Sequence, residues 1–211
     1  MYTWPRKPFI LAHRGARQQA PENTILAFQK AFELGADGFE CDVFLSKDRI
    51  PVILHDETLD RTTAGTGFVW EHSADQLRVL GVPTLEEALE TMPQNGIVNL
   101  ELKDCKPWNP EILAENIMLL LKRHEHRIEV VISSFNPALL KPWSGWPIGL
   151  LFESEQSIQV PRDIEVQALH IDRSSLTKAP KGYPLVFWTA PDTETAKKWL
   201  SEGADGVIAE L

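Results

Sequence analysis

The stretch 9-FILAHRG-15 joins four apolar residues directly to a histidine, an arginine and a glycine. Such a short apolar run is typical of a buried strand, so His13 and Arg14 stand at its carboxyl end. The next extended segment, residues 37–45, carries Glu40 and Asp42. A histidine can carry a proton, an arginine can bind an anion, and carboxylates can bind a cation. All of these side chains lie within or directly after the expected strands.

Extended and helical segments alternate along the chain. The pattern predicts strands at residues 9–12, 37–45, 97–102, 128–133, 148–152, 166–171, 184–189 and 205–209, with helices at 24–34, 84–92, 110–125, 136–141 and 192–202. Strands separated by helices indicate a parallel sheet. Because these strands number eight, we predict an α/β fold of the closed (β/α)8 type, the TIM barrel.

A further extended segment, 50–55, follows the second strand too closely for a parallel crossover. Residues 40–55 are therefore expected to form a hairpin that turns at Ser46–Arg49. In that register Leu45 faces Ile50, and His55 comes to lie opposite Glu40. The hairpin then brings a second histidine to the carboxylates.

Composition limits the kinds of partner. The 211 residues carry a formal net charge of −9, which argues against nucleic acid as a main partner. No apolar run reaches the length of a membrane span, so stable membrane insertion is not expected, and the amino end lacks a signal-peptide pattern. We expect one domain, residues 1–211, in the cytoplasm, acting on a small molecule; an oligomer is compatible with the sequence.

Three carboxylates are predicted to converge on one cation. Glu40 and Asp42 point the same way from one strand, and Glu101 comes from the next strand. Like charges this close repel unless a cation lies between them, and oxygen ligands suit Mg²⁺ or Ca²⁺. The alternative is a salt-bridge network with Arg14 and Lys103.

His13 and His55 are candidate proton carriers, because an imidazole can accept or donate a proton near neutral pH. Arg14 has a planar fork that suits phosphate oxygens, the alternative being a pair with a nearby carboxylate. His170 and Trp188, at later strand ends, are candidate substrate contacts. A structural hydrogen bond is the alternative for His170.

Together these residues carry a resemblance that spans nearly the whole chain. The motifs are AHRG (12–15), PENT (21–24), GADGFECDV (35–43), LSKD (45–48), VILHDETLDRTT (52–63), PTLEEAL (83–89), NLELK (99–103), VISSF (131–135) and GADGVIA (203–209). In this order they resemble the glycerophosphodiester phosphodiesterase family, in particular its short bacterial cytoplasmic members.

The resemblance implies a barrel with a small insertion after the second strand, here about residues 46–82. It implies a divalent metal on Glu40, Asp42 and Glu101. It also implies an acid/base pair of His13 and His55, with Arg14 and Lys103 on the phosphate. The expected reaction is hydrolysis of glycerophosphodiesters to glycerol 3-phosphate and an alcohol.

Two other functions stay open on sequence alone. One is a related barrel phospholipase acting on lysolipids or sphingolipids, and the other is a non-catalytic phosphodiester-binding barrel. The chain also departs from the family pattern at Ala190-Pro191 and Ala209-Glu210. It ends at Leu211, so the last barrel helix is expected to be missing.

Overall fold

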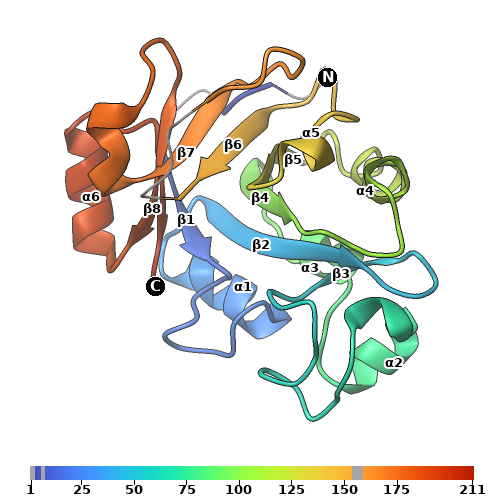
Figure 1. The fold of residues 1–211 in the computed structure, drawn as a ribbon. Helices are drawn as coiled ribbons and strands as arrows, with labels where there is room; N and C mark the ends of the chain where they lie inside the picture. Colours follow the sequence, from blue (N-terminus) through green and yellow to red (C-terminus); the bar gives the residue numbers. More distant parts are fainter. Residues whose placement is uncertain (1–2, 6–7, 154–158) are drawn as a thin grey trace.

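A computed structural model describes residues 3–5, 8–153 and 159–211 (Figure 1). The strands in this part are β1 (Phe9–His13), β2 (Gly38–Leu45), β3 (Pro51–Ile53), β4 (Gly96–Leu102), β5 (Ile128–Ser134), β6 (Ile148–Phe152), β7 (Ala168–Asp172), β8 (Leu185–Ala190) and β9 (Gly206–Ala209). The helices are α1 (Ile25–Glu33), η1 (Val69–Glu71), α2 (Ala74–Val79), α3 (Leu85–Glu90), α4 (Pro110–Leu121), α5 (Pro137–Leu140), η2 (Arg173–Lys178) and α6 (Thr193–Ser201), where η marks a 3₁₀ helix.

Eight parallel strands close into a barrel, which confirms the predicted fold class. The order is β1-β9-β8-β7-β6-β5-β4-β2, and β1 also pairs with β2. At the closing seam Ala12 of β1 pairs with Ala209 of β9. The chain continues two residues beyond β9, to Leu211.

The helices begin where polar side chains cap them. Thr24 and Asn109 accept hydrogen bonds from the first turns of α1 and α4. Thr84 and Glu87 form a capping box at the start of α3. The sequence pattern does not predict the short helices η1, α2 and η2.

The β2–β3 hairpin is present, but its predicted register is wrong by one residue. Leu45 pairs with Pro51 rather than Ile50. The loop has three residues instead of four, since Ser46 N bonds to Ile50 O at 3.0 Å. Its third residue, Arg49, adopts a left-handed conformation with φ 63°, as a type I turn followed by a left-handed residue requires.

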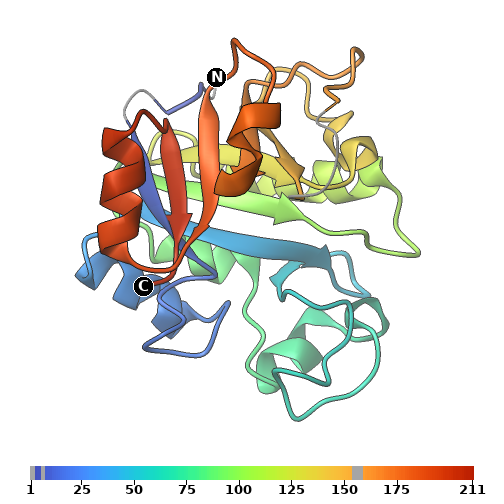
Figure 2. The ribbon, with the colours of Figure 1, turned by 60° about the vertical axis from the view of Figure 1, so that its left-hand side comes forward.

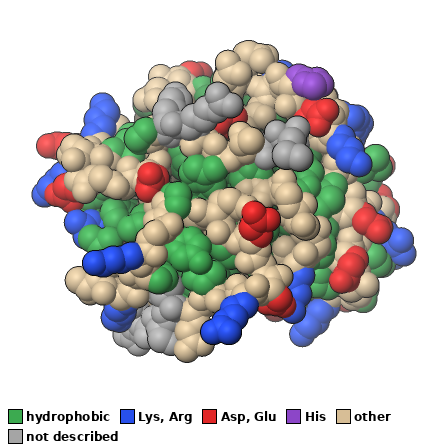
Figure 3. All heavy atoms as spheres, turned by 90° about the horizontal axis from the view of Figure 1, so that it is seen from above, with side chains coloured by type: hydrophobic (Ala, Val, Ile, Leu, Met, Phe, Trp, Pro, Cys, Tyr) green, Lys and Arg blue, Asp and Glu red, His purple; other side chains and the backbone are tan. Residues whose placement is uncertain are grey.

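The insertion between β2 and α3 packs at one end of the barrel. Figure 2 shows the η1 and α2 segment below β2, and α6 beside β9 and β1. On the face drawn in Figure 3, the acidic and basic side chains that are shown in colour are scattered, and neither the negative nor the positive charges form a continuous patch. None of the helices in the described ranges is both long and apolar enough to cross a membrane.

The core has two parts. One cluster fills the barrel interior with Phe9, Leu11, Ile97, Val186 and Ile208. The larger cluster lies between the strands and the surrounding helices. Its packing fixes α1 against the barrel wall.

We expect Phe28→Ala to lower the free energy of unfolding by about 3–5 kcal/mol, because the ring is buried and stacks on Phe39 at 4.0 Å between centroids. Leu26, on the same helix, is 51% exposed, so Leu26→Ala is the matched control and should cost less than about 1 kcal/mol. Denaturant unfolding of both variants measures this. Equal losses would show that α1 does not depend on the Phe28–Phe39 stack.

Candidate active site

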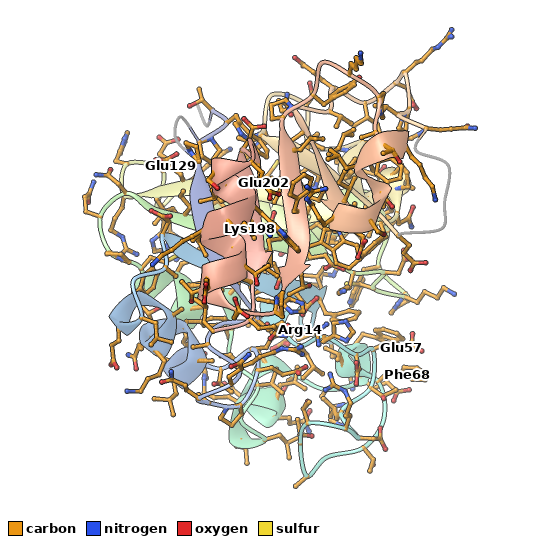
Figure 4. All side chains as sticks on the ribbon, turned by 90° about the vertical axis from the view of Figure 1, so that its left-hand side faces the viewer. Arg14, Glu57, Phe68, Glu129, Lys198 and Glu202 are labelled. Carbon is orange, nitrogen blue, oxygen red and sulfur yellow. The ribbon has the colours of Figure 1, made fainter. Side chains whose placement is uncertain are left out.

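Sequence-distant polar residues meet in a cavity at the carboxyl ends of the barrel strands. The cavity has a volume of about 240 Å³. It is lined by His13, Arg14, Glu40, His55, Asn99, Glu101, Lys103, Phe135, Leu151, Glu153, Trp188, Thr189 and Ile208. In Figure 4, Arg14 lies toward the end at which the strand arrows point, and Glu57 and Phe68 of the insertion lie beside this end.

The three predicted carboxylates converge. One oxygen each from Glu40, Asp42 and Glu101 lies within 4.8 Å of the others. The register explains this, because Asp42 of β2 pairs with Glu101 of β4 and Glu40 lies two residues earlier on the same face. Glu40 and Asp42 are 2% and 1% exposed, and Glu40 and Glu101 line the cavity, so the cluster forms part of the cavity floor.

Fixed donors hold these carboxylates. The backbone N–H of Arg14 donates to Glu40 Oε2 at 3.0 Å. The Asn23 amide donates to Asp42 Oδ2 at 2.8 Å. Lys103 Nζ lies 2.9 Å from Asp42 Oδ1 and also pairs with Glu101.

The cluster shifts its own pKa values. Burial, with help from Asp42 and Glu101, raises the pKa of Glu40 well above its usual range. Burial and Asp42 likewise raise the pKa of Glu101. Burial acts in the same direction on Asp42, but the charges of Lys103 and Arg14 outweigh it and lower the pKa of that carboxyl. One lysine and one arginine thus do not fully compensate three carboxylates.

The donor set fits a hard divalent cation. Glu40 Oε1 is buried and has no hydrogen-bond partner among the described residues, and the same is true of Asn99 Oδ1 beside it. Asn99 is 1% exposed, and Glu40 pairs with it across β2 and β4. Unsatisfied oxygens next to two more carboxylates are the ligand type that Mg²⁺ and Ca²⁺ take.

His13 has its ring fixed by the far end of the chain. Its Nδ1 lies 2.8 Å from Glu210 Oε1. Burial raises the pKa of Glu210, but hydrogen bonds from His13 and Arg17 outweigh it and bring this pKa to about 2. An ionised carboxylate only accepts, so Nδ1 carries the proton, and Nε2 is the nitrogen left for chemistry.

His55 has the same arrangement in the insertion. Its Nδ1 lies 2.6 Å from Asp56 Oδ1. Hydrogen bonds from Arg61 and His55 bring the pKa of Asp56 to about 2. Burial lowers the pKa of His55 itself, which favours its neutral form.

The predicted substrate contacts divide into two groups. Arg14, Lys103 and Trp188 line the cavity, and the Trp188 ring lies 5.5 Å from that of Phe135. His170 does not line it. The His170 ring fills the space beside Gly149. A Cβ added at Gly149 would come within 2.1 Å of His170 Nε2.

His170 lies inside the barrel, where Leu151 and Val186 are its partners in the neighbouring strands. Neither ring nitrogen has a hydrogen-bond partner in the described part of the chain. Burial lowers its pKa to about 3, so the ring is neutral. The alternative of a structural hydrogen bond is therefore not seen either.

Sequence reasoning missed several residues of the site. Glu210 stands out in the sequence only as a departure from the family pattern, and Asn23 only as part of the motif PENT. Asn99 gave a usable signal, since it precedes Glu101 by two residues and must share its face. Phe135 is the last residue of the motif VISSF, but no local pattern indicates that its ring lines the cavity, because it follows β5 in a loop.

Comparisons with known proteins identify the family of the chain. The model of the glycerophosphoryl diester phosphodiesterase family matches residues 13–210. The glycerophosphodiester phosphodiesterase of Caldanaerobacter subterraneus subsp. tengcongensis is 32% identical over 230 residues, covering 97% of this chain and 94% of the relative.

Two solved structures superpose over nearly the full chain. The glycerophosphodiester phosphodiesterase from Thermotoga maritima has a TM-score of 0.79 at 28% identity, covering 98% of this chain and 96% of that one. An Oleispira antarctica phosphodiesterase in complex with the product sn-glycerol-3-phosphate has a TM-score of 0.78 at 28% identity, covering 97% and 93%. By its sequence match over residues 13–210 and its full-length relative, the chain belongs to the glycerophosphoryl diester phosphodiesterase family.

Proposed function

We propose that residues 1–211 form one catalytic domain that hydrolyses glycerophosphodiesters to glycerol 3-phosphate and an alcohol. The observation that carries this is a single cavity holding two carboxylate-anchored histidines beside three clustered carboxylates. The family membership supports it, as does the glycerol phosphate bound by the Oleispira antarctica relative. The cytoplasmic location stays a prediction from sequence.

The negative charge of a phosphodiester repels a nucleophile, so the site must first neutralise it. We propose that Arg14 and Lys103 contact the phosphate oxygens. Glu40, Asp42 and Glu101 would hold Mg²⁺ or Ca²⁺, and the bound cation would supply electrostatic stabilisation of the phosphoryl oxygens. Trp188 is proposed as an apolar wall for the substrate, whereas His170 is no longer proposed as a contact.

The two histidines move the protons. One accepts a proton from the nucleophile as its oxygen bonds to phosphorus, and the other donates a proton to the alkoxide as the P–O bond breaks. The sequence-based assignment has His13 as base and His55 as acid. The lowered pKa of His55 favours the exchanged roles, since a neutral imidazole is the better acceptor. The nucleophile is water or the substrate's own glycerol hydroxyl.

We expect the purified protein to release glycerol 3-phosphate from glycerophosphocholine with Mg²⁺ or Ca²⁺. A chelator should abolish turnover, and excess cation should restore it. A substrate lacking the glycerol hydroxyl tests the internal route, which needs that group. Turnover of micellar lysolipids but not of soluble glycerophosphodiesters would instead support the phospholipase, and no turnover of either would reject catalysis.

We expect Glu40→Gln to change thermal stability in opposite directions with and without metal. In chelator the variant should melt at or above the wild type, because it removes a buried carboxyl among like charges. In excess Ca²⁺ the wild type should melt higher, since a cation present at about 100 times its Kd adds about 2.7 kcal/mol. Thermal melts with both additions test this.

The pH dependence in chelator follows from the raised pKa of Glu40. A carboxyl with a raised folded-state pKa favours folding most below about pH 4.5, and this contribution is lost as the pH rises through the folded pKa. The wild type should therefore lose more stability than Glu40→Gln as the pH rises. Parallel curves would contradict the buried like-charge cluster.

We expect His13→Ala and His55→Ala each to lower kcat by about 10²–10⁴-fold, because each removes one proton transfer. With a 4-nitrophenyl leaving group, which departs without a proton, the variant of the acid should lose much less. Steady-state rates on both substrates identify which histidine is the acid. His126→Ala is the control, since that side chain is 95% exposed outside the cavity. Rates near wild type for both variants would reject the assignment.

A further inference from the structure

The PENT motif, residues 21–24, precedes α1, and its glutamate has no role in the site so far described. Glu22 is only 15% exposed and lies among three arginines. Its Oε1 is 2.6 Å from Arg61 Nη2 and 3.1 Å from Arg14 Nη1, and its Oε2 is 3.8 Å from Arg17 Nη1. Burial opposes its ionisation, but the hydrogen bonds and charges of Arg61 and Arg14 lower the pKa of Glu22.

Two of these arginines lead to the two histidines. Arg17 Nε donates to Glu210, the carboxylate that accepts from His13 Nδ1. The path is thus His13–Glu210–Arg17–Glu22, and its last link is the ion pair of 3.8 Å between Arg17 and Glu22.

The path to the other histidine consists of hydrogen bonds throughout, beginning with the one of 2.6 Å from Arg61 to Glu22. Arg61 binds Asp56 through both Nε, at 2.5 Å, and Nη2, at 3.2 Å. Asp56 in turn accepts from His55 Nδ1 at 2.6 Å. Glu22 is the residue at which the two paths meet.

These contacts are placed to orient groups rather than to stabilise the fold. The Arg17 and Arg61 side chains are 36% and 48% exposed, and ion pairs this exposed contribute little to stability. A proton transfer, in contrast, depends strongly on the angle and distance of the imidazole nitrogen. We therefore expect the network to affect the rate of proton transfer more than the stability of the fold.

We infer that Glu22 is a positioning residue that holds the rings of both His13 and His55, acting through Arg17–Glu210 on one side and Arg61–Asp56 on the other. This rests on the proposed catalytic function of the two histidines. With Glu22 neutral, each arginine keeps its histidine-side carboxylate but loses its fixed second partner. Both Nδ1 acceptors then gain freedom, and both Nε2 atoms leave their productive directions.

The test is Glu22→Gln, an isosteric neutral variant, assayed on glycerophosphocholine at saturating metal. We expect kcat to fall by about 10–100-fold, the cost of a misplaced catalytic group, with KM within about twofold of the wild type. Glu86→Gln is the control, because Glu86 forms an ion pair of 2.8 Å with Arg123 away from the cavity. It should leave kcat and KM unchanged.

A second comparison checks that the effect runs through the two carboxylates. In a variant that already carries Asp56→Asn and Glu210→Gln, adding Glu22→Gln should lower kcat by less than about twofold, since residues acting along one path are not additive. A further large loss would overturn the inference. So would an unchanged kcat in the single variant, or a rise in KM alone, which would place the effect on Arg14.

Histidine NMR separates this inference from the proposed function. In ¹⁵N-histidine-labelled protein without substrate, Glu22→Gln should shift the Nδ1 signals of both His13 and His55, and Glu86→Gln should not. If the wild type fails to hydrolyse glycerophosphodiesters, the proposed function fails and these signals still decide the positioning role. If Glu22→Gln does not fold, Arg17→Gln and Arg61→Gln replace it, each shifting only the histidine on its own side.

Discussion

The site depends on burying three carboxylates where β2 meets β4. Unpaired, such charges would oppose folding strongly, because a buried ion loses its hydration. The fold offsets this with Lys103, with the Asn23 amide and with the backbone N–H of Arg14. These donors fix the orientation of Glu40 and Asp42, but within the described ranges they leave Glu40 Oε1 without a partner. The remaining negative charge is what makes the floor of the cavity fit a cation.

Two of these donors occupy unusual backbone conformations. Arg14 and Asn23 have φ values of 56° and 57°, in the left-handed region that residues other than glycine rarely adopt. Such conformations persist where the surroundings over-determine them, often at functional sites. Here the backbone N–H of Asn23 donates to Arg14 O at 2.9 Å. The two residues therefore hold each other in place while each donates to a carboxylate of the cluster.

Patterns with a short repeat allowed most of the fold and the carboxylate group to be predicted. Alternation placed Glu40 and Asp42 on one face, and the short link after β2 required a hairpin. The predicted register of that hairpin was wrong, because the shorter loop needs Arg49 in a left-handed conformation. Arginine has no special preference for that conformation, so the sequence does not indicate it. His170 lies deeper than its place in the sequence indicates, because position near a strand end does not give depth, and the space for its ring depends on Gly149 of the neighbouring strand.

The partner of His13 could not be predicted for a different reason. Glu210 is 197 residues from His13 in sequence, and no local pattern relates them. They meet because a closed barrel makes the first and last strands neighbours, with Ala12 paired to Ala209 one residue before each. The same pairing that closes the sheet therefore sets the direction of the His13 imidazole. Barrel closure in this chain thus shapes the candidate active site as well as the fold.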